Sequence, residues 1–358
     1  MSGAARVRRA SCAAGAAWLA LACVARGADP PPRLPPGITP QVQAAIRNGL
    51  SYLAAKQGAD GSWREESGGP YGGYPIAMTS LSATALAMSG STPTSGAYSA
   101  QLSRSVGFLM ASVQPNGLIC RAGDEQVRSM YGHGFAMLFL SQMLGMEGDP
   151  ERMEAIRRIL QKGVVLTGGA QSEAGGWIYT ATPSGDEGSV TVTQVQALRS
   201  CRDAGIAVPK RIIDRAMRYL ELSQQEDGGI AYRLGMQGSR PPITAAAVVC
   251  WFNAGEYDNP RAVRALRLCK KRIRPNEADR DADVLGHYFY AHHYYAQAVW
   301  LAGEREWNDY FPAMREQLLA RQNDDGSWDG DGVGRIYGTA LALSILQLPY
   351  NYLPIYQR

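Results

Sequence analysis

Long uncharged apolar segments are missing from the sequence after residue 28. A membrane-spanning helix needs about 20 consecutive apolar residues, so we expect no transmembrane segment in the mature chain. A basic stripe interleaved with aromatic residues is also missing, and the net charge is only +4, which argues against a nucleic-acid partner. Alternation of apolar and polar residues, which would indicate β-strands, is absent as well. These absences predict an all-α globular protein.

Closely spaced cysteines are missing too. Two of the six cysteines lie before residue 28, and the other four stand far apart, at Cys120, Cys201, Cys250 and Cys269. Because no two of them form a Cys-x-x-Cys pair, we expect no zinc site, no other metal and no cofactor. The spacing leaves two alternatives open, disulfides in an exported protein or buried thiols in a helical core.

The N-terminus has the layout of a secretory signal peptide over residues 1–27. Three arginines within residues 6–9 precede an apolar stretch from Cys12 to Val24, and small residues follow at a plausible cleavage site before Ala28. We therefore expect a secreted or periplasmic protein, with a lipid anchor at Cys23 as an alternative. Residues 28–40 form a proline-rich lead, which predicts an extended tether.

A repeated motif organises the rest of the chain, residues 41–358. A glutamine is followed by a polar pair, a glycine, one further residue and a large apolar residue, typically as Gln-x-x-Asp-Gly-x-Trp. The clearest copies contain Gln57, Asp60, Gly61 and Trp63; Gly175 and Trp177; Asp227 and Gly228; and Gln322, Asp325, Gly326 and Trp328. The motif returns about every 50 residues, which is typical of repeat proteins, and one interval of double length predicts an eroded copy near residues 275–283.

The chemistry of the motif predicts a structural role. Glycine supplies the positive φ that ends a helix, and the glutamine and aspartate side chains can satisfy backbone groups at helix ends. The tryptophans are then expected to pack against the next repeat.

Each repeat should contain two helices of different character. The segment before a turn is amphipathic, as in residues 209–223, where Ile212, Ala216 and Tyr219 recur at helical spacing. The segment after a turn is apolar on nearly all sides, which indicates a buried helix. Outer amphipathic helices alternating with inner apolar helices predict an (α/α)6 toroid of about six helix–turn–helix repeats around a central cavity.

The recurring turn resembles that of the prenyltransferase/squalene-cyclase repeat family, which includes terpenoid cyclases. The resemblance covers residues 41–350 and implies a toroid with a ligand cavity lined by its inner helices. The known catalytic motifs of this family are nevertheless missing from this sequence. It contains no Asp-x-Asp-Asp acid, no Asp-x-Cys zinc pair and no Gly-Cys-Gly-Glu-Gln thioester.

One cluster of acidic residues could still carry chemistry. Asp279, Asp281 and Asp283 lead into a helix expected from Asp283 to Leu301, in which His287 would follow Asp283 at i, i+4. Such an Asp–His pair could act as an acid/base couple, and a carboxyl group in an apolar cavity has a raised pKa. The alternative interpretation is that these carboxylates cap the start of the helix.

Candidate cavity residues come from the inner segments. Tyr290 and Tyr294 continue the face of Asp283 and His287 along the fifth inner helix. The other candidates lie early in inner helices, where a polar mouth above an apolar cavity could form, namely Tyr131, His133, Thr191, Gln194, Thr244 and Tyr337.

These observations support three functional hypotheses. The leading one is an exported toroid that binds a small hydrophobic, isoprenoid-like ligand or a peptide at its central cavity. The second is a terpenoid-type cyclase or prenyl transferase that uses the Asp279–Asp283/His287 cluster. The third is a structural interaction module in which aromatic side chains fill the ring.

Overall fold

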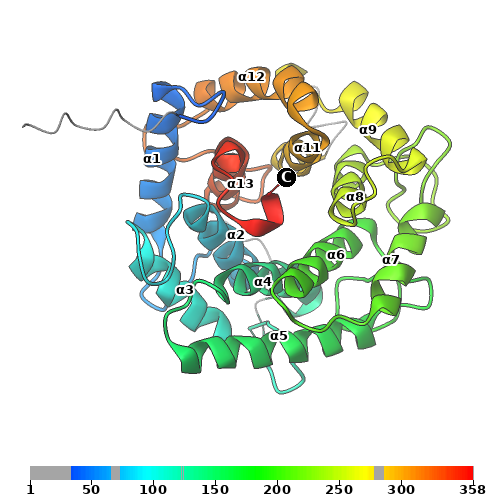
Figure 1. Cartoon of the computed structure of the whole chain (residues 1–358), viewed down its shortest axis with the longest axis horizontal. Helices are drawn as coiled ribbons and strands as arrows, with labels where there is room; N and C mark the ends of the chain where they lie inside the picture. Colours follow the sequence, from blue (N-terminus) through cyan, green and yellow to red (C-terminus); the bar gives the residue numbers. More distant parts are fainter. Residues whose placement is uncertain (1–33, 66–72, 122, 124, 278–285, 358) are drawn as a thin grey trace, which may run out of the picture. The chain divides into compact units, whose positions relative to one another are not determined.

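Twelve α-helices and no β-strand make up the part of the chain that the computed structural model describes, residues 34–65, 73–121, 123, 125–277 and 286–357. Outer and inner helices alternate along the chain, as the repeats predict (Figure 1). The outer helices are α1 (Pro40–Lys56), α3 (Ser99–Ala111), α5 (Pro150–Ala170), α7 (Lys210–Leu222), α9 (Pro260–Arg272) and α12 (Glu304–Ala320). The inner helices are α2 (Pro75–Ala87), α4 (Ser129–Met143), α6 (Gly188–Asp203), α8 (Pro241–Asn253), α11 (Tyr288–Ala302) and α13 (Arg335–Gln347).

The inner helices form a closed ring. Each packs against two inner neighbours, in the order α2, α4, α6, α8, α11 and α13, and α13 packs against α2 again. All residues of α2 are buried, as expected for a helix that is apolar on every side. The outer α7 instead buries only one face, with Ile212, Ala216 and Tyr219 turned inward. The predicted all-α toroid is therefore confirmed.

A shared pair of hydrogen bonds ties each of four repeat turns to the next outer helix. The side-chain amide of Gln57 donates to the carbonyl of Gly61 and to that of Gln101 in α3, both at 2.9 Å. The other three turns repeat this pattern, with Gln171 on Ile212 in α7, Gln224 on Arg261 in α9 and Gln322 on Ala45 in α1, each at 2.9 Å. Because the last turn binds α1, the outer helices also close into a ring.

Glycine is required where the turn meets the next helix. At Gly326 the backbone has a φ of +86°, and a Cβ added there would lie 2.6 Å from the carbonyl oxygen of Asn48 in α1. The aspartate of the turn accepts a hydrogen bond from the backbone two residues later, as Asp325 does from Ser327 at 3.0 Å. Asp60 and Asp227 do the same, so the aspartates stabilise the turn itself.

The tryptophans of the turns bind back to their own repeat. The indole N–H donates at 2.7 Å to the backbone carbonyl ten residues earlier, which is Leu53 for Trp63, Thr167 for Trp177 and Leu318 for Trp328. The expected packing on the next repeat is seen for Trp328, whose ring lies directly against Gly49 of α1.

One inner-helix position, here called the anchor position, holds five of the six inner helices to the turn before them. A threonine hydroxyl at this position accepts from the backbone N–H of the turn's large apolar residue at 2.9–3.0 Å. The residues that do so are Thr79, Thr191, Thr244 and Thr339. In α4 the position is occupied by His133, whose Nδ1 accepts from the Ile119 N–H at 3.1 Å.

The chain after α13 closes one end of the inner ring. It passes through the centre of the view in Figure 1 as two short 3-10 helices, Leu348–Tyr350 and Pro354–Tyr356. The indole of Trp300 donates to the carbonyl of Tyr356 at 2.9 Å, and the Ile355 N–H donates to Gln142 at 3.2 Å. This segment therefore seals the ring at the C-terminal ends of the inner helices.

Three sequence-based expectations concern other parts of the chain. No helix in the described ranges is long and apolar enough to cross a membrane. The four described cysteines are buried and form no disulfide with one another, and burial raises the pKa of Cys201 to about 12. The predicted signal peptide, Cys23 and most of the proline-rich lead lie outside the described residues.

The contact of Gly326 with α1 can be tested by comparing two glycines. Replacing Gly255 by alanine should cost about 1–2 kcal/mol of unfolding free energy, because its φ is +82° and nothing lies near the added Cβ. Gly326→Ala should cost about 1–3 kcal/mol more, because the added methyl group meets the Asn48 carbonyl. Denaturant unfolding of both variants measures the difference. Equal losses of unfolding free energy would show that the contact between Gly326 and α1 does not constrain the ring.

Candidate functional site

A cavity of about 490 Å³ lies inside the ring, at the N-terminal ends of the inner helices. Every inner helix contributes to its wall: Met78 of α2, Tyr131 of α4, Ser189 of α6, Ile243 of α8, Tyr290 of α11 and Tyr337 of α13. Most of the other lining side chains are apolar or aromatic, and no acidic residue is among the described ones. The wall suits an apolar molecule.

The cavity is closed on the side of the C-terminal segment and open at the N-terminal ends of the inner helices. Leu81 and Phe135 line both the cavity and a void of about 10 Å³ that Tyr356 also lines, so the segment after α13 lies beneath the floor. At the other end the exposed residues Arg128 and Arg240 line the cavity, which therefore reaches the surface between them.

Three of the predicted cavity residues, Tyr131, Tyr290 and Tyr337, line the cavity. Three others do not, because they occupy the anchor position and point toward the turns and outer helices. Thr191 and Thr244 each accept from a turn N–H and donate to a backbone carbonyl one turn earlier. His133 lies between the Ile119 N–H and the hydroxyl of Thr167 in α5.

Gln194 and Tyr294 also lie away from the cavity. The Gln194 amide donates to the Met130 carbonyl at 2.7 Å and so joins α6 to α4. Tyr294 is fully buried one turn after Tyr290, with its ring edge-to-face on that residue at 4.9 Å. Both side chains therefore pack within the inner ring and do not face the cavity.

The helix expected to carry the Asp–His couple is shorter than predicted. Helix α11 begins at Tyr288 rather than Asp283, because Gly286 has a φ of +72° and His287 has an extended backbone. His287 therefore precedes the helix, yet it lines the cavity. Asp279, Asp281 and Asp283 lie outside the described residues. Within the described ranges, no group of three or more His, Cys, Asp or Glu side chains could hold a metal ion.

Carboxylates behind the cavity wall, of which Glu125 is buried and Glu65 and Asp331 are half-buried, were not predicted as site residues. Glu125 accepts from the Ile76 and Ala77 N–H groups at the start of α2, at 3.0 and 3.1 Å. Asp331 accepts from the first N–H groups of α11, and Glu65 accepts from the Tyr337 N–H in α13. Each comes from the chain that leads into the next inner helix. Side chains that cap a neighbouring helix leave no periodic signal in the sequence.

Glu187 is the carboxylate most closely connected to the cavity. It is fully buried and accepts from the Val190 N–H at 2.8 Å and from the hydroxyl of Ser189. Burial raises the pKa of Glu187, and these hydrogen bonds offset part of the rise. The Tyr131 hydroxyl donates to it at 3.3 Å, so Tyr131 stands between Glu187 and the cavity.

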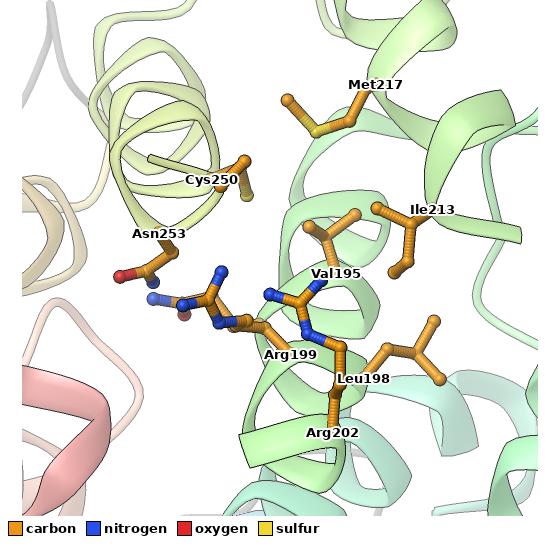
Figure 2. A pocket seen from close by; sticks show the side chains of 10 residues that line it. Val195, Leu198, Arg199, Arg202, Ile213, Met217, Cys250 and Asn253 are labelled. Atoms are coloured by element: carbon orange, nitrogen blue, oxygen red, sulfur yellow. The ribbon is translucent and has the colours of Figure 1, made fainter. Parts of the chain in front are cut away.

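A second small pocket lies between α6, α7 and α8, outside the inner ring. It holds only about 30 Å³ and is lined by Ile213 and Met217 of α7 together with apolar and polar side chains of α6 and α8. Figure 2 shows Arg199 extending toward Asn253 at this pocket. The space is enough for about one water molecule, so the pocket is no site for a substrate.

Comparison with solved structures identifies the architecture. The type II terpene cyclase MstE from Scytonema, solved with geranylgeranyl dihydroxybenzoate, superposes with a TM-score of 0.61 at 16% identity, over 87% of this chain and 98% of that one. A protein from Actinoplanes gives 0.62 at 18% identity, over 86% and 98%. The chain has the terpene-cyclase toroid fold. An alpha-1,6-mannanase from Salegentibacter, solved with alpha-1,6-mannotriose, is also similar, with 0.60 at 10% identity over 86% and 98%.

No protein-family model and no curated protein matches the chain by sequence. The fold hosts both cyclases and glycosidases, so it does not by itself define a reaction.

Three buried histidines predict loss of stability in acid. Burial lowers the pKa of His133 and His293 to about 4 and that of His292 to about 3. As the pH falls below the unfolded pKa of 6.5, each histidine is protonated in the unfolded chain but stays neutral in the folded protein. Between that pKa and its folded pKa, each histidine therefore lowers the unfolding free energy by about 1.4 kcal/mol per pH unit.

The contribution of His133 can be isolated with His133→Thr, which installs the residue found at the anchor position of four other repeats. The raised pKa values of Glu187 and Asp331 act in the opposite direction and are common to both proteins. Between pH 6.5 and 4, the unfolding free energy should fall less steeply in the variant than in the wild type. The slopes should differ by the contribution of one proton, about 1.4 kcal/mol per pH unit. Identical slopes would contradict a neutral His133.

Proposed function

We propose that the protein is an exported toroid that binds an apolar, isoprenoid-like ligand in its central cavity. The cavity of about 490 Å³ carries this proposal, since an interaction module without a ligand would not need an open chamber. Its size falls in the usual range for small-molecule sites, and its lining by Met78, Ile243 and tyrosine rings suits a branched hydrocarbon.

Two further observations support this proposal. The similarly folded MstE was solved with geranylgeranyl dihydroxybenzoate, a molecule with an isoprenoid chain. The charge and apolar pattern of residues 1–27 supports export. The exposed Arg128 and Arg240 line the cavity at one end, and the segment after α13 lies beneath its floor at the other, which favours a small molecule that enters from one side over a peptide that crosses the ring.

A second candidate function is terpenoid-type cyclisation or prenyl transfer by the Asp279–Asp283/His287 cluster. The observation that favours it is the position of His287 on the cavity wall.

Filling the cavity should abolish ligand binding without unfolding the protein. Ala77 lines the cavity, and in Ala77→Phe the added ring would occupy ligand space. Affinity for farnesol, measured by calorimetry, should fall by about tenfold or more. Ala100→Phe, on the exposed surface of α3, is the matched control and should bind farnesol normally. Unchanged affinity in Ala77→Phe, or no binding to the wild type, would refute the proposal.

The catalytic alternative makes a separate prediction. Incubation of the wild type with geranylgeranyl substrates should yield cyclised or transferred products, detected by mass spectrometry. His287→Gln should keep farnesol affinity but lose turnover, because the residue lines the cavity without closing it. Absence of any product from the wild type, under conditions where it binds farnesol, would leave the protein as a binder.

A further inference from the structure

We infer that the ligand of the cavity is an alcohol, whose hydroxyl group donates a hydrogen bond to Ser189 or Tyr131 in the wall. This inference rests on the proposed function, because the hydrocarbon part of the same molecule would fill the apolar chamber. Ser189 of α6 and Tyr131 of α4 both line the cavity and are half-buried. The inference assigns a chemical class to the ligand, an isoprenoid-like alcohol rather than a plain hydrocarbon.

Ser189 and Tyr131 share a hydrogen-bond network with the buried carboxylate of Glu187. The Ser189 hydroxyl lies 2.7 Å from both carboxylate oxygens and 2.5 Å from the Tyr131 hydroxyl, which lies 3.3 Å from the carboxylate. Glu187 is the residue before α6, and α6 packs directly against α4. The network therefore joins two neighbouring inner helices at the wall of the cavity.

The surroundings of Glu187 favour its ionised form. Its Oε1 accepts from the Ser189 N–H at 3.1 Å and its Oε2 accepts from the Val190 N–H at 2.8 Å, at the start of α6. Hydrogen bonds to a carboxylate and the positive end of a helix both stabilise the negative charge. These effects counteract the rise in the pKa of Glu187 that burial causes. An ionised carboxylate can only accept hydrogen bonds.

The negative charge of Glu187 determines the direction of the hydrogen bonds in this network. The protons of Ser189 and Tyr131 are directed to the carboxylate or to each other, because a charge-assisted hydrogen bond is about twice as strong as a neutral one. The remaining lone pairs of both hydroxyl oxygens are left for the cavity. A ligand group that donates a hydrogen bond can pair with them, whereas a group that only accepts, such as an ether or an aldehyde, cannot.

The rest of the wall favours an alcohol over an amine as the donor. Arg240 also lines the cavity, and its positive charge disfavours a protonated amine. An ammonium group would in addition lose far more hydration free energy than a hydroxyl group when it enters an apolar chamber. A neutral hydroxyl group meets neither penalty.

This preference can be measured by calorimetry with four probes that share one hydrocarbon chain, namely farnesol, farnesyl methyl ether, farnesal and farnesylamine. The wild type should bind farnesol about fivefold more tightly than each of the others. A purely apolar wall would instead favour the ether, because the alcohol gives up hydrogen bonds with water when it enters. Farnesol bound no more tightly than any one of the other three probes would overturn the inference.

The variant Glu187→Gln tests the direction of the network. The glutamine oxygen can still accept from the Val190 N–H, but the amide group donates to Ser189, whose proton is then available to the cavity. The farnesol-to-ether affinity ratio should therefore fall by about fivefold. Glu125→Gln, which changes another buried glutamate that caps an inner helix, is the matched control and should keep the wild-type ratio.

Ser189→Ala provides a second test, because it removes one of the two acceptors and leaves the Glu187 cap in place. It should lower the farnesol-to-ether ratio by about threefold. An unchanged ratio in Glu187→Gln, or in Ser189→Ala where Glu187→Gln does not fold, would overturn the inference alone. Failure of all four probes to bind the wild type would refute the proposed function with it.

Discussion

The contact that four of the repeat turns make with the next outer helix is the constraint on which the rest of this structure depends. A glutamine amide reaches a backbone carbonyl across the gap, while a glycine with no side chain lets the two backbones approach. The inner helices are apolar on all sides and cannot define their own orientation, so these outer contacts determine the angle between successive pairs. The ring closes because the turn at Gln322 finds Ala45 in α1 in the same way that Gln57 finds Gln101 in α3.

Closure has an electrostatic consequence for the cavity. It gathers the N-terminal ends of six inner helices around one opening, and helix N-termini attract negative charge. The chain meets this demand internally with Glu65, Glu125, Glu187 and Asp331, which bind the first N–H groups of four helices. Because these carboxylates cap helices behind the wall, no acidic side chain stands among the described residues that line the cavity.

The sequence was sufficient to predict the toroid but only part of its site. The turn motif reports directly on the ring, since Gln322, Gly326 and Trp328 of the last turn all contact α1. Periodicity could not separate Tyr131, which faces the cavity, from His133 two residues later, because both faces of α4 are buried. The anchor position was hidden for a second reason. Its distance from the turn varies with loop length, from 16 residues at Thr79 to 11 at Thr339.

The fifth repeat, whose turn motif is eroded, shows how the ring is maintained without it. The short helix Pro275–Glu277 contacts α12, and the Gln317 amide reaches Asn276 at 3.4 Å. At the anchor position of α11, His292 bonds to the Tyr310 hydroxyl of α12 at 2.9 Å instead of to a turn N–H. The start of α11 is then held by Asp331 from the sixth repeat. This repeat thus exchanges backbone contacts for side-chain contacts, and it keeps the register of the ring, because Tyr290 lines the cavity two residues before His292 as Tyr131 does two residues before His133.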